Sequence, residues 1–170
     1  ARDEALIALM ARAGLRRQEV VRIGVEDLDL EAGEVRVRHA KRGRERVMPL
    51  PGSATAWLGR WRAVRGGVPG PLMLPVDRRG VPRLRAMSPG AVRDAVRRRA
   101  AQAGLGDVAT PHDLRRAYIT DLLTAGVDVF TVQRLADHHD PAVTARYDRR
   151  GDEVRRRAVG LLDPEPRPPG

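Results

Sequence analysis

The sequence predicts a mostly helical α+β domain with one small antiparallel β-sheet. Apolar residues recur at helical spacing in most segments, whereas strict alternation is confined to residues 34–39. The length of 170 residues suffices for one domain with a core of its own. We therefore expect a single domain built mainly from helices, with one β-hairpin.

The charge balance indicates a polyanionic partner. A formal net charge of +10 is typical of proteins that bind nucleic acid, although codon bias toward arginine accounts for part of it. The lack of cysteine excludes disulfides, thiolate metal sites and cysteine nucleophiles. No apolar run reaches about 18 residues and no signal peptide is visible, so we expect a soluble, cytoplasmic protein without membrane contact.

The first segments combine a helix with an acidic and basic pair. Residues 3–13 have helical apolar spacing, and Gly14 is expected to end that helix as a C-cap. In the following GLRRQEV stretch, Arg16 and Glu19 lie one turn apart. Taken alone, this pair fits a surface ion pair.

A β-hairpin is predicted next. Residues 34–39 (EVRVRH) place valines on one face and Arg36 and Arg38 on the other, and residues 46–50 form the second strand. The turn between them carries Lys41, the only lysine of the chain. A lysine can release its proton at an accessible pH and an arginine cannot, so Lys41 is either a proton-transfer residue or a chance survivor on a loop.

The middle of the chain predicts a helix and a long loop. Residues 53–65 form the helix, with Ser53 as its cap and its two tryptophans in the core. Residues 66–87 are rich in Gly, Pro and Arg and predict a loop with a short strand at 72–74.

A clear helix follows over residues 88–104. Ser88 caps it and Gly104 stops it. Its exposed arginines include Arg93 and Arg97, which either follow a phosphate backbone or form a solvated face.

The stretch TPHDLRRAYIT predicts a helix with an anion site at its start. Thr110 is the expected N-cap, Pro111 fits the first helical position, and Asp113 completes an approximate capping box. His112 and Arg115 then share one face near the partly positive end of the helix. A phosphodiester is the obvious anion for so basic a protein.

The C-terminal part predicts shorter elements. The preceding helix ends at Gly126, and Asp128 or its neighbour starts another, which leads into LADHHDPAVTARYDRR. Residues 152–162 form a last amphipathic helix, and the proline-rich residues 164–170 are expected to be disordered.

Together these segments resemble the catalytic domain of the tyrosine recombinase (phage integrase) family. GLRRQEV resembles the box of the first catalytic arginine, HDLRRAYIT resembles the His-x-x-Arg box, and the lysine hairpin stands between them in family order. In the last box the histidine precedes the tyrosine by nine positions, which selects His138 over His139. The implied catalytic residues are Arg16, Lys41, His112, Arg115, His138 and Tyr147, with Glu19 in support.

The resemblance implies DNA strand cleavage and rejoining through a 3′-phosphotyrosine, without metal, ATP or other cofactor. The arginine pair would hold the non-bridging oxygens, Lys41 would protonate the leaving 5′-oxygen, and the histidines would assist. The expected partners are double-stranded DNA, contacted by Arg36, Arg38, Arg93 and Arg97, and further copies of the chain, contacted through residues 152–162.

The resemblance also implies a domain organisation. We expect the catalytic domain to cover residues 1–163, and the amino-terminal domain with which the family clamps DNA to be absent. The family usually has glycine where this chain has Asp137, so the His138 loop is expected to tighten or shift.

Three rival functions remain at this point. A type IB topoisomerase-like enzyme shares the chemistry but relaxes supercoils. A DNA-binding module that lost catalysis would have Asp137 as its lesion. A helix-turn-helix regulator would keep the basic charge but leave Lys41 and Tyr147 unexplained.

Overall fold

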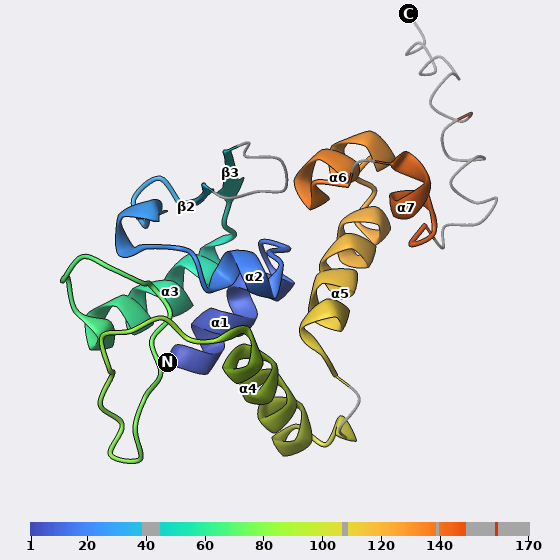
Figure 1. Ribbon diagram of the computed structural model, residues 1–170. Helices are drawn as coiled ribbons and strands as arrows, with labels where there is room; N and C mark the ends of the chain where they lie inside the picture. Colours follow the sequence, from blue (N-terminus) through green and yellow to red (C-terminus); the bar gives the residue numbers. More distant parts are fainter. Residues whose placement is uncertain (39–44, 107–108, 139, 149–158, 160–170) are drawn as a thin grey trace, which may run out of the picture. The chain divides into compact units, whose positions relative to one another are not determined.

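The computed structural model describes residues 1–38, 45–106, 109–138, 140–148 and 159. The described residues form two compact units, one over residues 1–119 and one that begins at Thr120 (Figure 1). Helices dominate the described residues of both, and a three-stranded antiparallel sheet lies in the first unit. The predicted class, mostly α with a small sheet, is therefore confirmed. No helix in the described ranges has the length and apolar content to cross a membrane.

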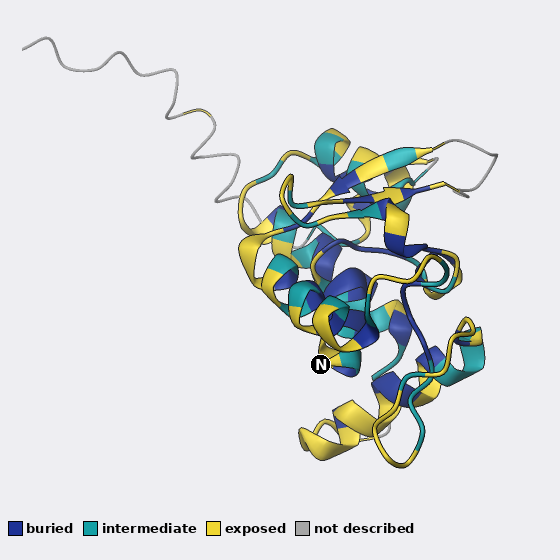
Figure 2. Cartoon of the chain, turned by 90° about the vertical axis from the view of Figure 1, so that its left-hand side faces the viewer, coloured by how far each residue is buried: buried dark blue, intermediate teal, exposed yellow. Residues whose placement is uncertain are grey.

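The first unit is built around its N-terminal helix. Its helical elements are α1 (Arg2–Ala11), α2 (Arg17–Val20), the 3-10 helix η1 (Val25–Asp27), α3 (Gly52–Arg65), α4 (Pro89–Gln102) and the first part of α5 (Pro111–Thr124). Helix α1 packs against α3, α4 and α2. Its apolar residues Leu6, Leu9 and Met10 are fully buried, and each stabilises the fold by about 1.5–3 kcal/mol. Figure 2 shows the resulting stripes of buried and exposed residues along the helices.

The sheet has the order β1-β2-β3, with β1 at Leu28–Asp29, β2 at Glu34–Val37 and β3 at Arg46–Pro49. Strands β2 and β3 pair antiparallel, with Val35 opposite Met48. Val35 and Val37 are buried, so the alternation in the sequence identified the core-facing side correctly. The sequence did not predict β1, because two residues are too few to show a period.

Several predicted helix starts and ends are confirmed. The Ser88 hydroxyl accepts a hydrogen bond from the Ala91 N–H at 3.1 Å at the start of α4, and Gly104 follows that helix with φ 74°. The Thr110 and Asp128 caps also form, and Gly126 has φ 90°.

Three local predictions were wrong. Helix α1 ends at Ala11, so Gly14 is not its C-cap but belongs to the turn that follows. Helix α3 begins at Gly52 with Pro51 at the N-cap, because the extended Pro51 backbone already starts the helix ahead of Ser53. Residues 72–74 are buried but form no strand, because their backbone bonds go to two separate segments. Leu72 N–H donates to the Ile23 carbonyl at 2.7 Å, and the Met73 carbonyl accepts from Met87 N–H at 3.1 Å.

The tryptophans of α3 differ in burial. Trp61 is 1% exposed, and its indole N–H donates to the Leu72 carbonyl at 2.9 Å. Trp57 is only half-buried. Trp61 is therefore the core anchor that the sequence predicted, and Trp57 fills that role only in part.

The second unit contains the end of α5, then α6 (Val129–Ala136) and α7 (Pro141–Ala145), which contact each other. Val132, Ala136 and Thr144 are fully buried within it. The predicted helix 152–162, apart from Val159, and the tail 164–170 lie outside the described residues.

Candidate functional site

The capping box at the start of α5 forms as predicted. The Thr110 N–H and hydroxyl both donate to Asp113 Oδ2, at 3.0 and 2.6 Å, and the Asp113 N–H donates back to the hydroxyl at 3.3 Å. These bonds depress the pKa of Asp113, the Thr110 side chain being the largest cause. The start of α5, which carries His112 and Arg115, is thereby fixed.

Arg115 is held from beneath by the backbone of a distant turn. Its side chain is 4% exposed, and its Nη1 donates to the Gly14 carbonyl. Gly14 has φ +64°, and a Cβ at this position would lie 2.4 Å from Cδ1 of Tyr118. Only glycine fits this turn, which brings the α1–α2 connection against α5.

Arg16 is held by Glu19 across the first turn of α2. The Arg16 N–H donates to Glu19 Oε2 at 2.8 Å, and its Nη1 lies 3.0 Å from Oε1. Arg46 of β3 donates to the same Oε2 at 3.0 Å. Glu19 is 5% exposed, so the surface ion pair that the sequence allowed is in fact buried at its acidic end.

The electrostatics of Glu19 follow from these bonds. Burial alone would raise the pKa of its carboxyl, but hydrogen bonds from Arg46 and from the Arg16 backbone, with both positive charges, outweigh burial and lower it. Glu19 therefore stays ionised and keeps both arginines oriented.

An open pocket of about 390 Å³ collects the predicted phosphate-binding residues. Its lining residues are Arg16, Arg17, Gln18, Arg93, Thr110, Pro111, His112 and Arg115. This lining includes four guanidinium groups and no carboxylate. The pocket therefore suits an anion such as a phosphodiester.

Two lining residues were missed by sequence reasoning. Arg17 and Gln18 are exposed and open helix α2 directly after Arg16. Their place beside the first arginine was the available signal. Arg93, predicted as a DNA contact, also lines this pocket.

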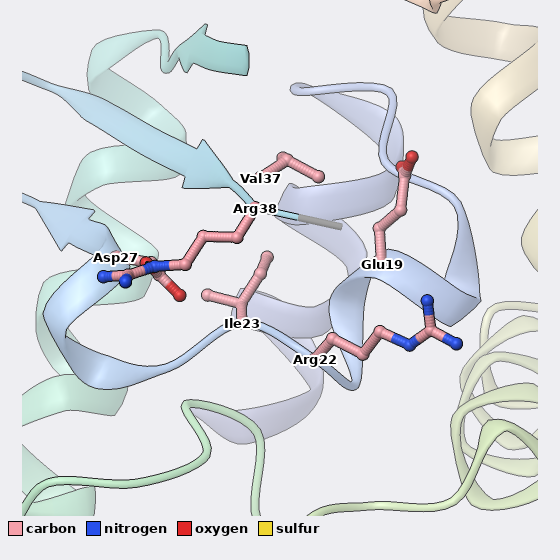
Figure 3. A pocket seen from close by; sticks show the side chains of 6 residues that line it. All are labelled: Glu19, Arg22, Ile23, Asp27, Val37 and Arg38. Carbon is pink, nitrogen blue, oxygen red and sulfur yellow. The ribbon is translucent and has the colours of Figure 1, made fainter. Parts of the chain in front are cut away.

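A second, far smaller pocket of about 10 Å³ lies beside Glu19 (Figure 3). It has room for about one water molecule. In this view Arg38 reaches toward Asp27, and the two form an ion pair whose hydrogen bond raises the pKa of Arg38. The positive charge of Arg38 is thus partly compensated by Asp27. Arg36 lies on β2 and is exposed. The DNA contacts assigned to Arg36, Arg38 and Arg97 stay predictions.

The second unit places its candidate residues close together. His138 Nδ1 lies 2.9 Å from the hydroxyl of the fully buried Thr144. The His138 and Tyr147 rings stack with centroids 6.3 Å apart and planes at 30°. Thr144, which orients the histidine, was not predicted, although it precedes the tyrosine by a single helical turn.

Asp137 adopts the conformation that glycine favours. It has φ 49° and ψ 46° as the C-cap of α6, and is the one non-glycine residue with positive φ in the described ranges. The next N–H, that of His138, donates to the Gln133 carbonyl at 3.0 Å. The helix therefore ends in a left-handed turn of the kind that glycine usually provides.

The two tyrosines differ in burial. Tyr118 is 7% exposed, and burial raises the pKa of its hydroxyl despite the charges of Arg115 and Arg46. Tyr147 is half-buried and follows the C-cap of α7. The antiparallel pairing of β2 and β3 confirms the two paired strands that the sequence predicted. Lys41 and His139 lie outside the described residues.

The chain belongs to the phage integrase family, whose model matches residues 1–153. Among its relatives, the tyrosine recombinase XerC of Vibrio parahaemolyticus serotype O3:K6 is 34% identical over 148 residues, which cover 86% of this chain and 46% of that protein. The XerD protein of Pseudomonas aeruginosa PAO1 is 33% identical over 151 residues, covering 86% of this chain and 49% of that protein. The chain thus spans about half the length of these relatives.

The fold also matches solved recombinase structures. The XerA recombinase crystal structure aligns with a TM-score of 0.75 at 23% identity, covering 97% of this chain and 59% of that one. At this identity the likeness establishes only the fold. The fold is that of tyrosine recombinase catalytic domains.

Proposed function

We propose that this chain cleaves and rejoins double-stranded DNA at a specific site through a 3′-phosphotyrosine intermediate, and so acts in DNA recombination or integration. The observation that carries the proposal is the arginine-lined pocket, in which Arg16 and Arg115 are both fixed by partners beneath it. Family membership supports the same chemistry.

In the proposed reaction the two arginines hold the non-bridging oxygens of the scissile phosphate. Their planar N–H groups donate to oxygens whose negative charge grows in the transition state. Because both side chains are already held in place, little reorganisation is needed. Each such donor contributes roughly 3–4 kcal/mol of transition-state stabilisation. His112, exposed at the pocket rim, adds a further hydrogen bond.

Tyr147 is assigned as the nucleophile. Its hydroxyl oxygen bonds to phosphorus as the bond from phosphorus to the 5′-oxygen breaks, which leaves a 3′-phosphotyrosine and a free 5′-hydroxyl. His138, beside the Tyr147 ring, assists removal of the hydroxyl proton. Lys41 supplies the proton to the departing 5′-oxygen. Rejoining reverses these steps, so bond energy is conserved.

The partners follow from the same proposal. The Tn1549 transposon integrase, solved in complex with a circular intermediate DNA, has this fold with a TM-score of 0.72 at 19% identity, covering 93% of this chain and 59% of that one. We assign double-stranded DNA as substrate, the cytoplasm as location, and residues 152–162 as the contact between copies on DNA. The proposed catalytic domain covers residues 1–163.

A covalent-capture experiment tests the proposal. The chain is incubated with a pool of nicked duplex oligonucleotides of random sequence, and adducts that survive denaturant are isolated and sequenced. Wild-type protein and Tyr118→Phe should form the adduct, and Tyr147→Phe should bind DNA without forming it. If Tyr147→Phe forms the adduct and Tyr118→Phe does not, Tyr147 is not the nucleophile.

A plasmid assay with the selected sequence then distinguishes recombination from relaxation of supercoils. Two copies of it on one plasmid should yield exchanged products with the chain. Relaxation of supercoils without exchange would instead support the topoisomerase-like activity, and binding without any adduct would support a DNA-binding module.

A further inference from the structure

The buried carboxylate of Glu19 is shared by two arginines from different elements. Its Oε1 lies 3.0 Å from Arg16 Nη1, and its Oε2 accepts from Arg46 Nη2 at 3.0 Å and from the Arg16 backbone at 2.8 Å. Arg16 lines the pocket, while Arg46 does not. Glu19 therefore connects a pocket residue to one outside the pocket.

We propose that Arg46 is a positioning residue for DNA cleavage, which fixes the Arg16 guanidinium at the phosphate pocket by holding the Glu19 carboxylate. This inference rests on the proposed function. It adds a residue of β3 to a phosphate site whose lining residues come from α2, α4, α5 and the residues that adjoin them.

The burial of these three side chains supports a role for Arg46 in positioning Arg16 through Glu19. The Arg16 side chain is 33% exposed, whereas those of Arg46 and Glu19 are 14% and 5% exposed. A long side chain that is one-third exposed has rotamer freedom of its own, so its orientation depends on its partner. That partner is in turn oriented by Arg46.

The backbone around Arg46 is well fixed. Arg46 pairs with Val37 in the β2–β3 ladder, and the next ladder residues include the buried pair Val35 and Met48. Arg46 thus links the sheet to Glu19 of α2. An ionised Glu19 agrees with this arrangement, since the arginine hydrogen bonds hold its pKa low against burial.

The test compares Arg46→Met and Arg46→Lys with wild type and with Arg60→Met. Arg60 is a suitable control because it also pairs with a carboxylate, Glu4 at 3.3 Å, but at an exposed site. Single-turnover cleavage is measured on the nicked duplex selected by covalent capture. A second substrate carries a neutral methylphosphonate at the scissile position, and a third carries a 5′-bridging sulfur.

On the phosphodiester, Arg46→Met should cleave about 10- to 100-fold more slowly, as when an outer partner of a binding side chain is lost. DNA affinity should change little. On the methylphosphonate the loss should shrink, because a neutral phosphorus centre depends less on the Arg16 charge, and Arg16→Ala should show the same shift. Arg46→Lys should recover part of the rate, because an ammonium still donates to Glu19.

Three outcomes would overturn the assignment. An equal loss on phosphodiester and methylphosphonate would mean that Arg46 only supports the fold. Rescue of Arg46→Met by the bridging sulfur would mean that it serves the leaving group. Wild-type rates in Arg46→Met would mean that it serves neither. Failure of wild type itself to form an adduct would refute the proposed function, which is a separate result. If Arg46→Met does not fold, Arg46→Gln and Arg46→Lys give the same comparison.

Discussion

The two units hold their candidate catalytic side chains in different ways. In the first, Arg115 binds the carbonyl of Gly14, which is 101 residues away in sequence, and Arg16 is fixed by a carboxylate that β3 also contacts. In the second, His138 binds Thr144 and stacks on Tyr147, and both of these contacts lie within nine residues of it.

This difference predicts which substitutions should lower the stability of the fold as well as the cleavage rate. Arg115 is held by a carbonyl distant in sequence, and the carboxylate that holds Arg16 also binds β3, so the geometry of both arginines depends on the folded first unit. By contrast, His138 contacts Thr144 of α7 and the Tyr147 ring, both nearby in sequence. Damage to the arginine partners should therefore affect cleavage and the stability of the first unit together, whereas damage near His138 should affect cleavage without lowering the stability of the first unit.

The largest expected effect comes from Arg115. Arg115→Ala should slow cleavage by about 100- to 1,000-fold, because one fixed donor to the phosphate is lost. It should also lower the free energy of unfolding, since the buried Gly14 carbonyl loses a donor. Single-turnover cleavage and urea unfolding followed by circular dichroism measure both. His138→Ala, as the contrast, should slow cleavage without lowering the stability of the first unit, and equal destabilisation would break the comparison.

A somewhat smaller effect is expected at Gly14. Gly14→Ala should destabilise the first unit by roughly 2–4 kcal/mol, from left-handed backbone strain plus the clash with Tyr118. Gly104→Ala is the matched control, because Gly104 has φ +74° with nothing within 4 Å of an added Cβ. That variant should lose only the strain, about 1 kcal/mol. Similar losses in both variants would show that the Tyr118 contact yields easily.

Acid should weaken the first unit. The pKa of Glu19 lies below its ordinary 4.5, and that of Asp3, bound by Arg2 and Arg99, lies below 3.8. A depressed folded-state pKa gives stability that is full above the unfolded value and is lost as pH falls through the folded value. Unfolding midpoints should therefore drop below about pH 4.5. Glu19→Gln should flatten this dependence, and an unchanged slope would show that Glu19 carries none of it.

The smallest effect concerns the turn before His138. Asp137→Gly should stabilise the second unit by about 0.5–1 kcal/mol, because glycine adopts φ 49° without the strain of a side chain. Asp137→Ala should not stabilise it. Thermal unfolding of the two variants measures the difference. Destabilisation by glycine would show that the aspartate side chain contributes more than its backbone strain costs.

Local signals in the sequence predicted most of the fold. The caps at Ser88, Thr110 and Asp128 each form within four residues, so α4, α5 and α6 were predictable with their starts. The alternation at 34–37 likewise identified β2. The failure at residues 72–74 has a long-range cause, since their backbone partners Ile23 and Met87 lie outside the local window. The failure at Ser53 is local, because the Pro51 carbonyl two residues earlier already accepts the first hydrogen bonds of α3.

The candidate site was predictable in residue type but not in its supports. The motif order indicated Arg16, His112 and Arg115, and all three line one pocket. The contacts beneath them join residues 27 and 101 positions apart, so no local pattern shows that Arg46 reaches Glu19 or that Gly14 binds Arg115. The roles of Lys41 and Tyr147 stay predictions until cleavage is measured.

The position of Trp61 has a practical consequence for such experiments. Both tryptophans of the chain lie on α3, and the buried one donates its indole N–H to the Leu72 carbonyl. Intrinsic fluorescence excited at the indole band therefore reports the first unit alone, and its emission should shift to longer wavelength when that unit opens. The second unit is silent in this signal, so a DNA-induced change in tryptophan emission would originate within residues 1–119.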